Sequence, residues 1–288
     1  MQDSQSPNIA ALEFFFERHF EKRSRGLPRD ADSLKSAIAY SLHSGGKRFR
    51  PQVAFLTADL LGIGLDRVLP HAAAVELMHT YSLIHDDLPC MDDDSYRRGV
   101  PTNHVMFGED TALLAGDALL TEAFYVIGDG YASVPELGLE LARLLAEAAG
   151  LTGMIAGQAV DLKMARASAE LTPAKVEQIL DMHERKTGAL IRYAAEGVAV
   201  LARLPQKERE QVREFGVKFG LAFQIADDLL DFDPRVPEQN GLPARLGVEK
   251  TRELLNSVSQ DCQSILLNYG GRAGHLVTLV KKNLIRKK

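Results

Sequence analysis

Residues 139–151 read LELARLLAEAAGL, a run in which leucine and alanine recur every three or four positions. Leu and Ala are strong helix formers, and this spacing places Leu141, Leu144, Leu145 and Ala148 on one face of a helix. The apolar residues within 176–194 repeat the pattern. We find no convincing run of alternating, strand-like residues along the chain, so the sequence predicts an all-α fold.

Proline and glycine mark the ends of the expected helices. Outward from the first run, we expect long helices over residues 66–88 and 206–232. Thr172-Pro173 is typical of a helix start, and the three prolines of residues 233–243 predict a loop. Because no linker rich in Ser, Gly or Pro divides the chain, we predict one large helical domain over residues 1–288.

Composition narrows the class of protein. The chain has 288 residues, 45% of them hydrophobic, which is enough for a sizeable core and excludes disorder for most of its length. The net charge of −5 argues against nucleic acid as the main partner. Cys90 and Cys262 cannot form a disulfide scaffold and suit a reducing compartment. No uncharged run reaches the length of a membrane span and no signal-like N-terminus is present, so we expect a cytoplasmic protein.

Two dense aspartate clusters end apolar stretches that we expect to be helices. The first contains Asp86, Asp87 and Asp92, and the second contains Asp227, Asp228 and Asp231. Several carboxylates held together repel one another unless cations neutralise them. Hard cations with oxygen ligands fit this need, and Mg²⁺ shared with phosphate oxygens fits best. The clusters therefore predict a magnesium site.

The spacing within each cluster supports this reading. Asp227 and Asp231 are four residues apart, so both carboxylates face the same side of a helix. Asp86 and Asp92 are six apart and would diverge on an ideal helix. Pro89 disfavours helix at the preceding residue, so the chain can bend there and bring Asp92 back.

Basic groups accompany the acidic ones at three places. Residues 45–51 read GGKRFRP, residues 97–99 read RRG and residues 185–188 read RKTG. Each alone fits a salt-bridged surface, but three basic sites with two metal-binding clusters match a substrate pair carrying two diphosphates. His79 lies seven residues before Asp86 on the same helical face, although a lone histidine there is more often a core or cap residue.

Two metal-site patterns compete with this interpretation. Glu76 and His79 form a Glu-x-x-His, as in di-iron helical bundles, but that site needs a second such motif and none is present. His85-Asp86 resembles the pair of metal phosphohydrolases, which would require further histidines and gives the second aspartate cluster no role.

Taken together, the chain resembles the trans-isoprenyl diphosphate synthases, most closely the bacterial short-chain farnesyl diphosphate synthases. Five motifs of that family occur in order between about residues 40 and 232: GGKRxRP at 45–51, DDx4D with RRG at 86–99, GQxxD at 157–161, KTGAL at 186–190 and FQ with DDxxD at 223–231. One such motif alone is a weak signal, whereas five ordered motifs are strong. The resemblance implies a helical bundle with a central cavity, the type I isoprenoid synthase fold, in a homodimeric enzyme.

The resemblance also implies roles for individual residues. Three Mg²⁺ ions would be held by Asp86, Asp92 and Asp227, with Asp87, Asp228 and Asp231 completing the motifs. The allylic diphosphate would be contacted by Arg97, Lys186, Thr187 and Gln224, which also serve the chemistry. Isopentenyl diphosphate would be bound by Lys47, Arg50, His79 and Arg98. The implied reaction is addition of isopentenyl diphosphate to dimethylallyl or geranyl diphosphate.

Product length is expected to depend on the floor of the cavity. In relatives, bulky residues just before the first motif limit chain growth. Tyr81 stands five residues before Asp86 and is followed by the small Ser82. This arrangement resembles the farnesyl (C15) type, with geranylgeranyl (C20) or another length as the alternative; as a plain core aromatic, Tyr81 would have no such role.

The region after Asp231 departs from the family. The loop is shorter than in relatives, Gln239 stands where the family has a lysine, and Gly241-Leu242 replaces Thr-Tyr. A non-catalytic partner subunit of a prenyl synthase would tolerate such a change. A class I terpene cyclase is a further alternative, although its second motif mixes Asn, Ser and Glu rather than aspartates.

Overall fold

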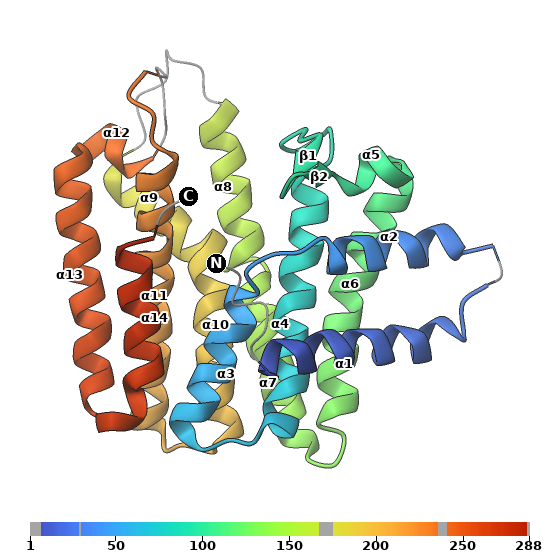
Figure 1. The fold of residues 1–288 in the computed structure, drawn as a ribbon, viewed down its shortest axis with the longest axis horizontal. Helices are drawn as coiled ribbons and strands as arrows, with labels where there is room; N and C mark the ends of the chain where they lie inside the picture. Colours follow the sequence, from blue (N-terminus) through green and yellow to red (C-terminus); the bar gives the residue numbers. More distant parts are fainter. Residues whose placement is uncertain (1–6, 29, 167–174, 236–240, 287–288) are drawn as a thin grey trace. The chain divides into compact units, whose positions relative to one another are not determined.

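The computed structural model describes residues 7–28, 30–166, 175–235 and 241–286, and they form an almost entirely helical protein (Figure 1). The predicted all-α class is confirmed. The predicted helix start at Thr172-Pro173 and Gln239 of the departing loop lie outside the described residues. The chain divides into two compact units: unit 1 comprises residues 1–55 and 64–142, and unit 2 comprises residues 56–63 and 143–288.

The helices and strands of unit 1 are, in order, α1 (Pro7–Ser24), α2 (Asp32–His43), α4 (Leu65–Asp86), β1 (Tyr96–Arg97), β2 (Val100–Pro101), α5 (Asn103–Phe107) and α6 (Glu109–Gly130). Two helices, α3 (Phe49–Leu61) and α7 (Pro135–Ala149), have residues in both units. The helices of unit 2 are α8 (Met154–Arg166), α9 (Val176–His183), the π-helix η1 (Glu184–Gly188), α10 (Ala189–Leu201), α11 (Gln206–Asp231), α12 (Leu242–Leu246), α13 (Val248–Leu267), the 3₁₀ turn η2 (Gly270–Ala273) and α14 (Gly274–Leu284).

Unit 1 is built on α4, which packs along α6 (Figure 1). Ala72, Ala73 and Ala74 of α4 are wholly buried, and Ala115 and Ala123 on α6 are wholly buried as well. Small side chains allow two helices to approach closely. The first aspartate cluster therefore stands at the end of a rigid core helix. The hairpin β1–β2 after it was not predicted, because strands of two residues leave no alternating pattern in the sequence.

Unit 2 is built on α10 and α11, with α13 packed on the other side of α11 (Figure 1). Every residue of α10 is buried, which fits its mostly apolar sequence; the two charged residues, Arg192 and Glu196, are paired with each other. One core cluster joins Ile179 of α9 and Ile225 of α11 to Leu242 of α12 and Leu255 of α13. The second aspartate cluster thus stands at the end of a second core helix.

Helix α6 is, among the described helices, the one long and apolar enough by length and composition to cross a membrane. Core helices share this property, and α6 packs one face against α4. Its other face leaves Leu113 46% and Leu114 56% exposed. This half-covered helix bears on the assembly proposed below.

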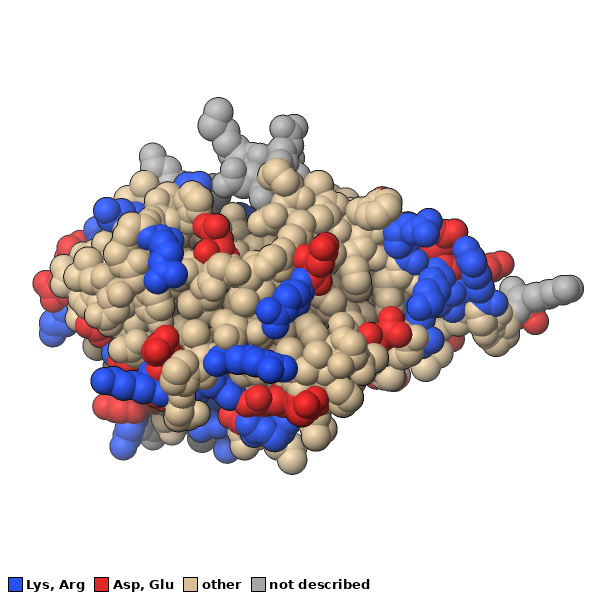
Figure 2. Space-filling model, turned by 90° about the horizontal axis from the view of Figure 1, so that it is seen from below, with Lys and Arg blue, Asp and Glu red and all other residues tan. Residues whose placement is uncertain are grey.

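Ion pairs between exposed side chains of the described residues contribute little to the stability of the fold. On the face in Figure 2, acidic and basic side chains are interspersed over a largely uncharged surface. Exposed pairs such as Arg18–Glu21 and Arg252–Glu249 are worth about 0–1 kcal/mol each. Burial of the apolar helix faces is therefore the main source of stability.

Candidate functional site

The first aspartate motif lies in a tight turn at the end of α4. The helix ends at Asp86, and the backbone N–H of Asp92 returns to donate to the Asp86 carbonyl at 2.9 Å. This contact brings Asp92 back beside Asp86, as the proline at position 89 predicts. Asp86 is half-buried and Asp92 is exposed, so both carboxylates are accessible to a cation.

Asp87 is placed differently. It is only 3% exposed, and its Oδ1 accepts a hydrogen bond from Nε of Arg97 at 2.6 Å. Burial raises the pKa of Asp87, and the Arg97 guanidinium opposes that rise. Arg97 also contacts Asp94 at 3.3 Å. In this structure Arg97, predicted as an allylic-substrate contact, therefore binds the hairpin to the end of α4.

Cationic groups gather around His79 in unit 1. Burial lowers the pKa of His79 well below its usual range, and the charges of Arg50 and Arg98 lower it further. Arg98 donates to the carbonyl of Gly45, and its guanidinium occupies the space that a side chain on Gly46 would need. Guanidinium groups thus lie near one buried imidazole, a combination whose donors are suited to an anion.

Arg48 is the most deeply buried cation of the GGKRFRP segment. It is buried, with Nη1 2.7 Å from Glu76 and Nε 2.8 Å from Glu13. Glu76, considered above as an iron ligand, thus has a guanidinium partner. His85 is likewise engaged, its Nε2 bonded to the Leu113 carbonyl at 3.0 Å. These contacts disfavour the di-iron and phosphohydrolase alternatives.

A stability prediction follows from the buried Arg48–Glu76 pair. Replacing Arg48 by Met leaves Glu76 buried without its counter-charge, which is expected to cost about 3 kcal/mol of unfolding free energy. Chemical denaturation measures this loss. The double variant Arg48→Met/Glu76→Gln should recover most of it; equal instability of the two variants would mean that packing, not charge, sets the cost.

Tyr81 and Ser82 lie one turn or more before the first motif on α4. Tyr81 is 4% exposed, and its ring packs edge-on against His85 with centroids 5.6 Å apart. Its hydroxyl is buried without a hydrogen-bond partner among the described residues, and burial raises its pKa to about 12. The Ser82 hydroxyl donates back to the His79 carbonyl at 2.9 Å.

The second aspartate motif ends α11, as predicted. Asp227 pairs with Arg286, whose guanidinium also lies 4.4 Å from the centre of the Phe223 ring. Asp228 is more enclosed, and its Oδ2 accepts hydrogen bonds from His183 at 2.9 Å and from the Leu242 backbone N–H at 2.8 Å. Asp231 is exposed. The three carboxylates therefore have three different surroundings.

The KTG segment forms a π-helix, an irregularity common at functional sites. Lys186 pairs with Asp161 of the GQxxD motif, and Thr187 is buried. A side chain on Gly157 would collide with the backbone of Lys186, and one on Gly220 would come within 2.7 Å of the Gly188 Cα. The π-helix is therefore held by close contact with α8 and α11.

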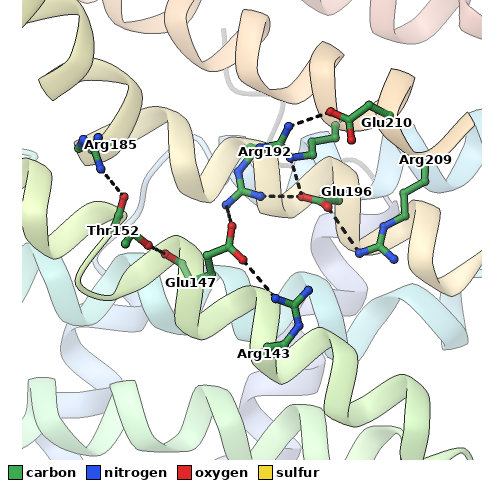
Figure 3. Close-up of polar contacts among 9 residues, drawn as sticks. Arg143, Glu147, Thr152, Arg185, Arg192, Glu196, Arg209 and Glu210 are labelled. Carbon is green, nitrogen blue, oxygen red and sulfur yellow. Dashed lines mark hydrogen bonds and ion pairs between the residues drawn. The ribbon is translucent and has the colours of Figure 1, made fainter. Parts of the chain in front are cut away.

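A network of charges fixes the continuation of this segment (Figure 3). Arg192 of α10 lies 2.7 Å from Glu196 and 3.4 Å from Glu147, and Arg209 lies 3.5 Å from Glu196. Arg185 joins the same region by donating to the Thr152 carbonyl at 2.9 Å. Because Arg192 and Glu196 are buried and paired, the network holds α10 in one position.

Three residues with distinctive contacts carried no assigned role from the sequence. In the sequence, His183 occupies a position on an apolar helix face, Arg286 is a charged residue near the C-terminal end, and Gln158 is only part of the GQxxD motif. Both amide atoms of Gln158 are buried without a partner among the described residues. Local sequence gives no signal for the partners of His183 and Arg286, or for the burial of Gln158. Gln224 is half-buried, and Lys47 is exposed.

The carboxylates fit Mg²⁺ by donor chemistry. Among the described residues, no three His, Cys, Asp or Glu side chains converge as a preformed cage. Mg²⁺ does not need one, because it usually takes one or two carboxylates together with water and substrate phosphate oxygens. Asp227 already forms an ion pair with the cationic side chain of Arg286. Asp86 and Asp92 in unit 1, and Asp227 and Asp231 in unit 2, each offer carboxylate oxygens of this kind.

Comparison with known proteins agrees with these features. The sequence model of the family described as Polyprenyl synthetase matches residues 31–243. The farnesyl diphosphate synthase of Bacillus subtilis is 42% identical over 77% of this chain and 73% of its own length. The geranylgeranyl diphosphate synthase of Cyanophora paradoxa is 40% identical over 78% of this chain and 75% of its own. The crystal structure of an FPP/GFPP synthase from Zymomonas mobilis superposes with a TM-score of 0.87 at 33% identity, covering 96% of this chain and 97% of that one. With its motifs at the ends of core helices and this extent of similarity, the chain belongs to the polyprenyl synthetase family.

Proposed function

We propose that this protein is a trans-prenyltransferase that condenses isopentenyl diphosphate with dimethylallyl or geranyl diphosphate and releases farnesyl diphosphate. One observation carries the proposal. Core helices α4 and α11 each end in accessible carboxylates. Each unit also holds groups suited to phosphate, Arg98 near the buried His79 in unit 1 and Lys186 in unit 2. Carboxylates for metal and cations for phosphate are the two requirements of diphosphate chemistry.

The chain's own residues bind and orient the substrates. Asp86, Asp92 and Asp227 would hold three Mg²⁺ ions, and Arg97, Lys186, Thr187 and Gln224 would contact the allylic substrate. When bound, Mg²⁺ stabilises the negative charge of the departing diphosphate. Lys47, Arg50, His79 and Arg98 hold isopentenyl diphosphate. In the substrate-free protein the pKa of His79 is lowered by burial and by Arg50 and Arg98, and its imidazole is suited to hydrogen-bond this diphosphate.

The reaction breaks the allylic C–O bond and forms one C–C bond. The double bond of isopentenyl diphosphate supplies the electron pair to the allylic cation, and the proton lost afterwards leaves with the departing diphosphate. No side-chain base is required. Backbone carbonyls in the π-helix at Lys186 and Thr187 and the Gln224 amide are suited to stabilise the cation, because a π-helix leaves carbonyls outside the regular α-helical pattern.

The test is an incubation with Mg²⁺, isopentenyl diphosphate and either dimethylallyl or geranyl diphosphate, with product length read by mass spectrometry. A C15 product supports the proposal. A C20 product would keep the chemistry and change the product assignment. Turnover without isopentenyl diphosphate would favour a terpene cyclase. No product from either starter, with diphosphate binding retained, would favour a non-catalytic partner subunit.

We further propose that the protein acts in the cytoplasm as a homodimer whose chains meet along α6. Exposed Leu113 and Leu114 of α6 continue into Val105 and Met106 of α5, which are 51% and 49% exposed. Apolar groups gathered in this way are typical of a protein–protein interface.

Replacing Leu114 by Lys is expected to weaken the dimer, because a charge would enter the apolar contact. Light scattering after size-exclusion chromatography should give twice the chain mass for the wild type and a concentration-dependent lower mass for the variant. Lys in place of Leu267, 77% exposed on α13, is the matched control and should leave the mass unchanged. A monomeric wild type would contradict the proposal.

A further inference from the structure

Asp228 is the most enclosed carboxylate of the second aspartate motif. Its side chain is 9% exposed, against 33% for Asp227. Its Oδ2 accepts two hydrogen bonds, from Nε2 of His183 at 2.9 Å and from the backbone N–H of Leu242 at 2.8 Å. One carboxylate oxygen is thus already engaged by protein donors.

The second of these bonds fixes the start of α12. The first backbone N–H groups of a helix have no partner within the helix, and Asp228 supplies an acceptor for that of Leu242. The Leu242 side chain is wholly buried in the core cluster of unit 2. A Cβ on Gly241 would lie 3.3 Å from the Asp228 Oδ2, so the chain passes close to the carboxylate at this point.

The hydrogen bond from His183 links Asp228 to a second segment, the one that precedes Lys186. His183 is the last residue of α9 and directly precedes the π-helix that carries Lys186 and Thr187. The imidazole is buried at 4% exposure. Through one carboxylate, α11 is therefore connected both to the segment before Lys186 and to the segment after the motif.

We propose that Asp228 and His183 are a positioning pair that fixes the ends of these two segments, and that Asp228 is a tether rather than a metal ligand. The proposal rests on the proposed function only for the consequence that Asp227 and Asp231 remain for the metal. It also means that α12 is attached to α11 by this hydrogen bond in addition to the chain that connects them.

The first aspartate motif independently shows the same difference between a buried second carboxylate and an exposed one. Its second aspartate, Asp87, is 3% exposed and bound by Arg97 of the hairpin that follows, whereas Asp92 is exposed. In each motif the second carboxylate thus binds the segment after the motif. A surface run of aspartates would not produce this repeated asymmetry.

The test compares amide and alanine substitutions at neighbouring carboxylates. Asp228→Asn keeps a carbonyl oxygen that can accept the same hydrogen bonds, and Asp228→Ala does not. Hydrogen exchange of the Leu242 amide in the metal-free protein should therefore be near the wild-type rate in Asp228→Asn and about tenfold faster or more in Asp228→Ala. His183→Ala should also accelerate exchange, and His183→Gln, which keeps a donor, should restore it in part.

The second readout is binding of magnesium pyrophosphate by calorimetry. A tether predicts that Asp228→Asn stays within about threefold of the wild type, whereas Asp227→Asn loses about tenfold or more. Equal losses in both variants, or unchanged Leu242 exchange in Asp228→Ala, would overturn the proposal. Should Asp228→Ala fail to fold, the His183→Ala and His183→Gln pair decides the same point. Failure of the prenyltransferase activity itself would leave the exchange result standing, so the two proposals fail separately.

Discussion

Replacing Asp86 by alanine is expected to lower turnover by about 10²- to 10³-fold while leaving the protein folded. The carboxylate stands at the end of α4, and the proposed function gives it a part in holding Mg²⁺. It is half-buried, so its removal should change the unfolding free energy by less than about 1 kcal/mol. Steady-state kinetics with a thermal melt of the same sample measure both quantities. Asp227→Ala is expected to behave alike.

The matched control for Asp86→Ala is Asp93→Asn, in the same turn. Asp93 is exposed and has a left-handed backbone with φ of 55°, a conformation that asparagine tolerates well. This variant removes one negative charge near the motif without touching a proposed ligand, so near-normal turnover is expected. Near-normal turnover in Asp86→Ala would remove that residue from the metal assignment. Equal losses of turnover in both variants would show that the effect comes from net charge alone.

Replacing Tyr81 by alanine is expected to lengthen the product from C15 to C20 or beyond. Five residues along α4 separate Tyr81 from Asp86, which is about 7.5 Å, and the tyrosine ring is the bulky group at that depth. Its loss leaves a space into which a longer chain can grow. Mass spectrometry of the extracted products measures the shift. Removing a buried aromatic ring also costs about 3–5 kcal/mol, so the assay belongs well below the melting temperature.

Tyr81→Phe separates the ring from its hydroxyl. The hydroxyl is buried without a partner among the described residues, so its removal should leave stability unchanged or raise it by about 1 kcal/mol. The ring remains, and a C15 product is expected. A folded Tyr81→Ala protein that still stops at C15 would show that another residue sets the length.

Sequence features within each helix, such as apolar spacing and a proline at its start, predicted the long helices well. The expected helix over residues 206–232 is found at Gln206–Asp231, and that over 66–88 is found at Leu65–Asp86. Pro205 and the apolar spacing are enough to specify the first. Of the loop expected over 233–243, residues 236–240 lie outside the described residues, and Leu242 already begins α12. Helix ends are set by capping contacts, and here the acceptor is Asp228, which lies fourteen residues earlier.

Features that depend on distant contacts were not predicted. The π-helix at Glu184–Gly188 has no sequence period of its own, and its shape depends on contact with α8 and α11. The carboxylates of the motifs could be identified from spacing, but their partners could not. His183 and Asp228 are 45 residues apart, and only the folded chain brings them together.

The contact of Gly157 and Gly220 with the π-helix limits how this chain can be changed in the laboratory. At these two positions even a methyl group would meet backbone atoms of residues 186 and 188, which cannot move aside as a flexible side chain would. Libraries that seek new product lengths should keep both codons constant. Diversity is better placed on α4 around Tyr81, where a smaller side chain leaves the backbone of the π-helix Glu184–Gly188 untouched.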